Sequence, residues 1–223
     1  MSGLFVTFEG PEGSGKSTHA NELSDRLRGM GFEVMRAREP GGTPTGEAIR
    51  EILQHDAAGE PVTRETELLL FAASRAQLVQ NVIKPALSRG AIVICDRFAD
   101  STTAYQGYGR NFDVERVLNL NEWATDGLAP DATLLMDLDV GVGFERIHKR
   151  NQELGQIEDR FEREERAFHE RVREGYLALA QRWPERFHII QSDAPVENVS
   201  AAIWNVIDPL LPDAACERRP DEG

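Results

Sequence analysis

The amino-acid sequence predicts an α/β fold in which a parallel sheet is flanked by helices on both faces. Short apolar segments alternate with longer segments of helical periodicity, and a glycine-rich loop joins the first apolar segment to the first helix. Strands that alternate with helices pair in parallel, and the helices then cover both faces of the sheet. Ligands of such sheets bind at the carboxyl ends of the strands, so we expect functional residues directly after each strand.

Apolar periodicity and turn residues define the elements in chain order. Strands are expected at residues 4–8, 32–37, 91–95, 132–138 and 187–191. Helices are expected from Ser17 to a cap at Gly31, around residues 49–53, over 65–87, after the N-cap candidate Asp113, over the charged stretch 140–182 and after Pro195. No repeat or low-complexity linker divides the chain. We therefore expect a single domain over residues 1–212 and a disordered polar tail over 213–223.

Composition excludes several classes of function. The 223 residues include 25 Lys and Arg against 38 Asp and Glu, for a formal net charge of -13. Nucleic acid polymers bind basic surfaces, so this charge argues against DNA or RNA as a partner, although a local basic pocket remains possible. The two cysteines, Cys95 and Cys216, form no metal-ligand spacing. Neither a signal peptide nor a membrane span is recognisable, and we expect a cytoplasmic protein.

The loop after the first strand has the composition of a phosphate-binding loop. It matches the pattern G-x-x-x-x-G-K-[ST] and lies between a predicted strand and a predicted helix, which indicates a three-layer P-loop NTPase-type fold. Glycines let backbone N–H groups turn toward a phosphate, Lys16 can reach the β- and γ-phosphates of ATP, and the Ser17 hydroxyl can bind Mg²⁺. A tight turn with a chance lysine is the alternative. The residues expected to bind the nucleotide are Gly10, Pro11, Glu12, Gly13, Ser14, Gly15, Lys16, Ser17 and Thr18.

Two charged residues directly follow the third predicted strand. Asp96 can hold a Mg²⁺-bound water across from Ser17, in a Walker-B arrangement, and Arg97 can clamp a phosphoryl group. An ordinary ion pair at a strand end is the alternative. Glu9, at the end of the first strand, is more ambiguous, since it can also serve only to anchor the loop.

The long predicted helix contains a charge within an apolar stripe. Leu68, Phe71, Leu78 and Val82 share one face, and Arg75 lies in its middle. A buried guanidinium requires a partner, because an unpaired buried charge is costly. Phe71 and Arg75 together offer a stacking surface beside a two-pronged donor, which suits a nucleobase with a carbonyl oxygen. The alternative is a core phenylalanine with an arginine that extends to solvent.

Two further segments are candidates for the site. The polar stretch 101–107 can line the same pocket with hydroxyls and an amide, or it is a solvated loop. The charged stretch contains Gly155 in a segment without apolar periodicity, which indicates a mobile flap. The phosphate loop lacks arginine, so a guanidinium for the transferred phosphoryl group has to come from elsewhere, and a lid arginine can supply it. The alternative for the charged stretch is a solvated helix face.

These segments together resemble the bacterial thymidylate kinases, a family of P-loop nucleoside monophosphate kinases. The resemblance rests on residues 8–10 with 15–18, 38–43, 70–75, 96–97 with 104–107, and 157–162. It extends in family order to about residue 211. Phe98 departs from the family pattern, which commonly has Tyr or His there. The resemblance implies transfer of the γ-phosphoryl group of ATP to dTMP with Mg²⁺, which gives dTDP for dTTP biosynthesis, and it implies a homodimer.

The resemblance also implies roles for individual residues. Phe71 would stack on thymine, Arg75 would bond a base carbonyl and Thr102 would lie near the base. The sugar and phosphate of dTMP would be held by Glu12 at the 3′-hydroxyl, Tyr105 under the sugar, and Arg97 with Arg50 at the phosphate. A small helical lid at about 146–162 would complete the site, with Arg150 and Arg160 as its catalytic arginines and Arg146 next.

Two other functions remain open at this point. A kinase for another small acceptor, such as dUMP, dCMP or a non-nucleotide alcohol, would use the same phosphate loop. A nucleotide-operated switch would bind ATP or GTP without an acceptor, but no N-K-x-D guanine-reading motif occurs in the sequence.

Overall fold

The computed structural model describes residues 3–55, 57, 59–155 and 159–212, and the expected tail lies outside them. Five parallel strands form one sheet in the order β2-β3-β1-β4-β5. Their bounds are Phe5–Glu9 (β1), Val34–Arg38 (β2), Ile92–Asp96 (β3), Ala132–Asp137 (β4) and Phe187–Gln191 (β5). The strands predicted from the sequence are therefore confirmed, each within two residues.

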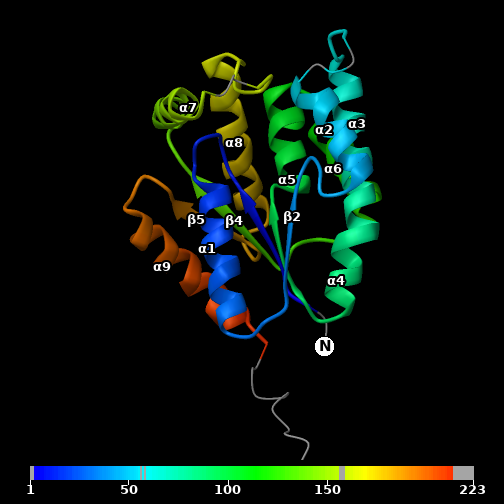
Figure 1. The fold of residues 1–223 in the computed structure, drawn as a ribbon. Coiled ribbons are helices and arrows are strands. Elements are labelled where there is room, and N and C mark those ends of the chain that lie inside the picture. Colours follow the sequence, from blue (N-terminus) through cyan, green and yellow to red (C-terminus); the bar gives the residue numbers. More distant parts are fainter. Residues whose placement is uncertain (1–2, 56, 58, 156–158, 213–223) are drawn as a thin grey trace, which may run out of the picture.

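Helices lie on both faces of this sheet (Figure 1). The α-helices are α1 (Lys16–Gly29), α2 (Pro44–His55), α3 (Arg64–Leu78), α4 (Lys84–Ser88), α5 (Ala99–Thr102), α6 (Val114–Thr125), α7 (Val140–Leu154), α8 (Arg166–Arg182) and α9 (Val196–Ile207). Two π-helical segments, η1 (Val79–Ile83) and η2 (Thr103–Gly109), continue α3 and α5, and a 3₁₀ turn, η3 (Asp208–Leu210), follows α9. Among the described residues, no helix has the length and apolar character needed to cross a membrane.

Alternate residues of the central strand divide the core into two layers. Val6 and Phe8 of β1 pack with α1 and α9, whereas Phe5 packs on the opposite face with η1 and α4. A third cluster, between η2 and α8, contains Tyr105 and Tyr176. This alternation places helices against both faces and confirms the predicted three-layer α/β arrangement.

The structure differs from the sequence expectations in three places. The helix predicted over 65–87 is continuous but contains the π-helical turn η1. The charged stretch 140–182 forms two helices, α7 and α8, rather than one. The stretch 101–107 is not a solvated loop, because it belongs to α5 and η2 and its residues from Thr102 to Gly107 are buried.

Glycines let α8 pack closely against η2. A Cβ atom at Gly175 would lie 2.7 Å from Cγ of Tyr108, and one at Gly109 would lie 2.7 Å from Cε2 of Phe168. Real Cβ atoms do not approach other atoms this closely, so the spacing of the two helices depends on the absence of both side chains.

We predict that Gly175→Ala destabilises the protein by about 1–2 kcal/mol in urea unfolding. Alanine favours a helix over glycine by about 1 kcal/mol, but overpacking a core contact costs about 1–3 kcal/mol. Gly29 of α1 is the matched control, because a Cβ there would meet no atom within 4 Å. Gly29→Ala should leave the free energy of unfolding unchanged or raise it slightly. Equal effects of the two substitutions would contradict the packing argument.

Candidate active site

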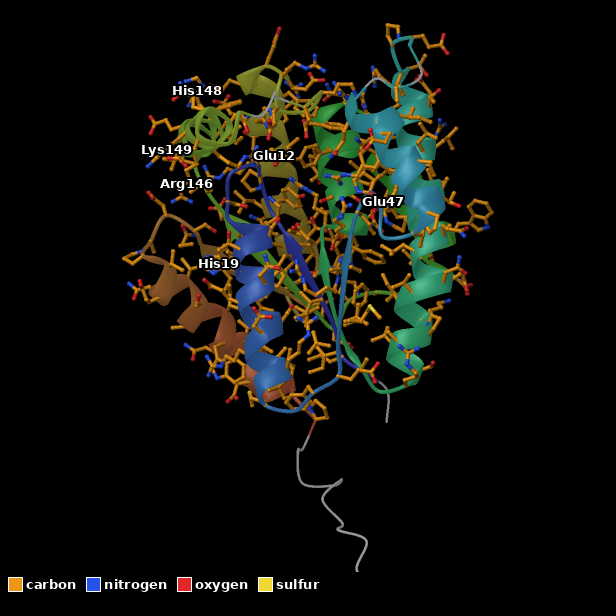
Figure 2. All side chains as sticks on the ribbon, viewed as in Figure 1. Glu12, His19, Glu47, Arg146, His148 and Lys149 are labelled. Carbon is orange, nitrogen blue, oxygen red and sulfur yellow. The ribbon has the colours of Figure 1, made fainter. Side chains whose placement is uncertain are left out.

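A cleft of about 1160 Å³ lies at the carboxyl ends of the strands. Its walls come from the phosphate loop, the ends of β2 and β3, helices α1, α2, α3, α5 and α7, the segment η2, and the segment between α7 and α8. In the view of Figure 2, Glu12 of the phosphate loop lies above the sheet, between α7, which carries Arg146, and Glu47 of α2. Residues predicted to bind the donor, such as Lys16, and residues predicted to bind the acceptor, such as Phe71, therefore line the same cleft.

The phosphate loop has the backbone that its glycines predict. Gly10, Gly13 and Gly15 all have positive φ angles, and Gly15 ends the loop as the N-cap of α1. A Cβ at Gly13 would lie 2.6 Å from the carbonyl oxygen of Gly143, so another residue would not fit there. The loop residues that line the cleft are Glu12, Gly13, Gly15, Lys16, Ser17 and Thr18.

The ammonium group of Lys16 lies inside this loop. Its Nζ donates to the carbonyl oxygens of Gly10 (3.1 Å) and Pro11 (2.7 Å) and contacts Oγ of Ser14 at 3.2 Å. Burial, together with repulsion by Arg97, lowers the pKa of Lys16 to about 8. An anion bound in the loop would favour the charged ammonium and raise this pKa.

Ser17 and Asp96 meet as the sequence predicts. The Ser17 hydroxyl donates to Oδ2 of Asp96 at 2.5 Å, because the parallel pairing of β1 with β3 places the strand ends side by side. A hydroxyl and a carboxylate are oxygen ligands suited to Mg²⁺, which usually keeps waters and phosphate oxygens as its other ligands. Among the residues that the structure describes, no group of three or more His, Cys, Asp or Glu could hold a metal ion.

Arg97 connects the two sides of the cleft. Its φ angle is 67°, and its Nη2 donates to Oε1 of Glu12 at 2.5 Å and to the hydroxyl of Tyr105 at 3.2 Å. Its Nη1 donates to the hydroxyls of Ser101 (3.2 Å) and Tyr176 (3.3 Å). Burial raises the pKa of Glu12, but the charges of Arg97 and Lys16 outweigh burial and hold that pKa at about 2.

Glu9 fixes the backbone around Arg97. Its Oε1 accepts from the Phe98 N–H at 2.7 Å, and its Oε2 accepts from the hydroxyls of Ser101 (2.5 Å) and Tyr176 (3.0 Å). These are the same two hydroxyls that contact Arg97. Burial, and then the nearby Asp100, raise the pKa of Glu9 to about 7 against the opposing effects of Ser101 and Arg97. The carboxylate therefore anchors Phe98, Ser101 of α5 and Tyr176 of α8.

Phe71 and Thr102 line the cleft, but Arg75 does not. Arg75 is 1% exposed, and its guanidinium donates to Glu39 through Nε (3.2 Å) and Nη2 (2.5 Å). Nη1 donates to Oδ1 of Asn121 at 2.7 Å, and Nη2 also contacts the Thr102 hydroxyl at 2.8 Å. The alternative interpretation, in which the Arg75 side chain extends to solvent, is therefore wrong. Arg75 lies in the wall behind the cleft with a buried carboxylate as its partner.

The arginines of the predicted phosphate and lid sites lie in different environments. Arg50 lines the cleft and donates to the carbonyl oxygen of Pro40 at 2.9 Å, and burial followed by repulsion from Arg38 lowers its pKa. Arg146 and Arg150 also line the cleft, and Arg150 pairs with Glu162 at 2.5 Å. Arg160 is absent from the lining; it pairs with the buried Glu67 at 2.7 Å and donates to the carbonyl oxygen of Leu53.

Comparison with known proteins assigns the chain to a family. The family model described as Thymidylate kinase matches residues 8–203. The chain belongs to the thymidylate kinase family. It is 50% identical over 212 residues to the thymidylate kinase of Pseudomonas putida strain GB-1, with 95% of this chain and 96% of that protein covered. It is 49% identical over 197 residues to that of an Exiguobacterium species, with 88% and 90% covered.

A solved member of the thymidylate kinase family has the same fold. The crystal structure of thymidylate kinase from Ehrlichia chaffeensis superposes with a TM-score of 0.74 at 34% identity, and the match covers 93% of this chain and 99% of that one. The predicted family, the predicted fold class and the assignment as a kinase are thereby confirmed.

Gln106 is a cleft residue to which the sequence assigned no role of its own. It is 1% exposed and lines the cleft, and its Oε1 has no hydrogen-bond partner within the described part of the chain. A buried acceptor without a partner costs about 1–3 kcal/mol, so it marks a place where a ligand donor would be accommodated. The sequence offered one signal, since the polar stretch 101–107 was a candidate to line the pocket with hydroxyls and an amide.

We predict that the pH dependence of stability differs between the protein and its Glu9→Gln variant. The pKa of Glu9 rises from 4.5 to about 7 on folding, so the folded state binds the extra proton. The contribution of this proton to stability is complete below pH 4.5 and is lost as the pH rises through 7. As the pH rises, the free energy of unfolding of the wild-type protein should therefore fall relative to that of Glu9→Gln, by about 3 kcal/mol in total.

Urea unfolding of both proteins from pH 4 to pH 8 at constant ionic strength measures this difference. Glutamine also changes the hydrogen bonds to Phe98 and Ser101, but that offset is independent of pH. A difference between the two proteins that stays constant over the range would contradict the raised pKa.

Proposed function

We propose that this cleft transfers the γ-phosphoryl group of ATP directly to the phosphate of dTMP, giving dTDP and ADP. The relatives at about 50% identity are thymidylate kinases, and this chain is an ATP-dependent kinase of dTMP. The observation that carries the mechanism is the shared cleft, into which both the phosphate loop and Phe71 open. The acceptor phosphate is already an anion, so catalysis consists mainly of positioning and charge stabilisation.

On the donor side, the phosphate loop would bind the ATP phosphates. Its backbone N–H groups and the N-terminus of α1 favour an anion. Lys16 would exchange the carbonyl oxygens of Gly10 and Pro11 for phosphate oxygens, which are stronger partners for an ammonium. Ser17 and Asp96 are the residues that fit Mg²⁺. When bound, Mg²⁺ would neutralise charge that develops on the phosphate oxygens.

On the acceptor side, Phe71 would stack on thymine, with Thr102 at the base edge. Gln106 would offer its unpartnered Oε1 to the N3–H of the base. Arg75 would bond a base carbonyl only by directing the second hydrogen of Nη1, whose first is donated to Asn121, from behind the wall into the cleft. The base would thus be read by stacking and by hydrogen bonds from buried groups.

The sugar and phosphate of dTMP would lie between the base side and the phosphate loop. Glu12 would accept a hydrogen bond from the 3′-hydroxyl, and Tyr105, whose hydroxyl donates to Glu12 at 3.1 Å, would lie under the sugar. Arg97 and Arg50 would hold the acceptor phosphate, since both guanidinium groups line the cleft. Their planar donor sets match the geometry of a phosphate.

The lid would be formed by residues of about 146–162, of which 156–158 lie outside the described residues. Arg150 would approach the transferred group, which its place in the cleft lining supports, and Arg146 lines the same cleft. Arg160 would take part only after leaving Glu67. In this proposal the lid is part of a single domain over residues 1–212.

We further propose a homodimer that forms through α3 and α6 and functions in the cytoplasm, where both nucleotides occur. Leu69 of α3 is 59% exposed and Trp123 of α6 is 81% exposed. The two helices pack against each other, and the hydrogen bond between Arg75 and Asn121 joins them. Large exposed apolar side chains of this kind are typical of protein interfaces.

We predict that Lys16→Ala lowers kcat for ADP release in the presence of ATP, Mg²⁺ and dTMP by at least about 10²–10³-fold. That range is typical for the loss of one preorganised group that stabilises charge in a transition state. Lys84→Ala, on α4 outside the cleft lining, is the matched control and should retain full activity. Circular dichroism checks that both variants fold. Normal turnover by a folded Lys16→Ala variant would overturn the role of the loop.

We also predict that Phe71→Ala weakens the binding of dTMP more than the binding of ATP. Loss of the stacking surface should raise KM for dTMP by about 10-fold or more, corresponding to about 1–3 kcal/mol of stacking, with KM for ATP nearly unchanged. An acceptor panel of dTMP, dUMP and dCMP in the same coupled assay identifies the substrate. Proportional increases in both KM values would argue against a base-stacking role.

A further inference from the structure

A buried carboxylate at the start of α3 lies outside the phosphate chemistry described above. Glu67 is 1% exposed and has charged or polar partners on both oxygens. Its Oε1 accepts from Nε2 of Gln106 at 2.7 Å and from Nε of Arg110 at 3.2 Å. Its Oε2 accepts from Nη2 of Arg110 at 3.2 Å and pairs with Nη2 of Arg160 at 2.7 Å. Such a group is costly to bury, and these partners offset that cost.

The partners of Glu67 determine the hydrogen bonds that it makes. Arg110 donates to both of its oxygens, through Nε and through Nη2, so both oxygens act as acceptors. The side-chain amide of Gln106 therefore has to present its NH₂ group to Glu67. The opposite orientation would place the amide oxygen 2.7 Å from a carboxylate oxygen, with two acceptors and no proton between them.

This constraint fixes what Gln106 offers to the cleft. With Nε2 bound to Glu67, Oε1 is the remaining polar atom of the amide, and it has no partner among the described residues. Gln106 is part of the cleft wall, as are Phe71 and Thr102. A ligand at this wall is thus met by a hydrogen-bond acceptor rather than by an interchangeable donor and acceptor.

Thymine and cytosine differ at the ring nitrogen N3, the atom that would meet this acceptor. Thymine carries a hydrogen on N3 and donates there, whereas N3 of cytosine has a lone pair and accepts. A fixed acceptor therefore pairs with thymine or uracil and repels cytosine. A site built to bond one hydrogen-bonding group rejects an analogue without it, because the buried polar atom stays unpaired.

We propose that Glu67 is the positioning residue that makes this kinase select thymine over cytosine, by holding the Gln106 amide with its oxygen toward the base. This inference rests on the proposed function, in which dTMP lies along Phe71. The same carboxylate holds Arg160, and Arg110 also pairs with Glu164 at 2.6 Å. Glu67 therefore also ties the segment before α8 to the wall that contacts the base.

The test compares Glu67→Gln with the wild-type protein. Glutamine keeps the size of the side chain but can donate as well as accept, so the Gln106 amide is free to reverse. We expect kcat/KM for dTMP to fall about 10-fold or more, mostly through KM, and the dTMP-to-dCMP ratio of kcat/KM to fall at least as far. Glu65→Gln, an exposed carboxylate in the same first turn of α3, is the matched control and should change neither value.

A second variant distinguishes positioning from general support. Gln106→Leu removes the acceptor itself, so adding Glu67→Gln to it should not change the dTMP-to-dCMP ratio further. If Glu67→Gln lowers activity with both nucleotides equally, or the ratio falls again in the double variant, the proposal is overturned. If Glu67→Gln does not fold, Glu67→Asp takes its place. Aspartate withdraws the carboxylate by one methylene group, and a ratio unchanged from wild type would then overturn the proposal.

The assay also separates this inference from the proposed function. A wild-type protein that does not phosphorylate dTMP refutes the proposed function. In the other outcome, the wild-type protein prefers dTMP to dCMP and the folded Glu67→Gln variant shows the same preference. This result refutes only the role of Glu67.

Discussion

The ion pair between Arg97 and Glu12 is the interaction on which the cleft depends. It joins the end of β3 to the phosphate loop, and the hydroxyls of Tyr105 and Tyr176 extend it to η2 and α8. Arg97 keeps a left-handed backbone, which is unfavourable for a residue with a side chain and has to be held by its surroundings. Glu9 supplies that support through the next N–H group, so the direction of the guanidinium follows from a buried carboxylate in β1.

The arginines of the cleft are already paired with oxygen atoms of the protein. Arg97 pairs with Glu12, Arg150 with Glu162 and Arg38 with Glu47. A phosphate that binds to them competes with a carboxylate and does not meet a bare charge, so its net contribution to affinity is a difference between two strong interactions. This arrangement also reconciles a chain of net charge -13 with a site for polyanions, since the basic groups converge locally on one cleft.

The sequence predicted the parts of the site that depend on local pattern. Strand periodicity placed Asp96 at the end of a strand, the loop motif placed Ser17 across from it, and the glycine spacing predicted the backbone of the phosphate loop. It did not predict the partner of Arg75, because Glu39 lies 36 residues earlier in the chain and only tertiary packing brings the two together. The segment 101–107 was uncertain for a related reason, since polar residues usually favour a solvated loop. Here Thr102 and Nε2 of Gln106 instead bond distant buried side chains.

Phosphate and base recognition use different physics in this cleft. Phosphates attract any converging guanidinium group, so charge alone suffices there, but charge cannot distinguish one pyrimidine from another. Bases differ in where they donate and accept, and hydrogen-bonding groups of fixed orientation read that difference. Two buried ion pairs behind the wall provide the orientation: Thr102 accepts from Arg75, which leaves its hydroxyl hydrogen for a carbonyl, and Gln106 donates to Glu67. A donor beside an acceptor is the complement of the O4 and N3–H edge of thymine. The buried charges of this protein thus act on the base through the neutral side chains that they hold in place.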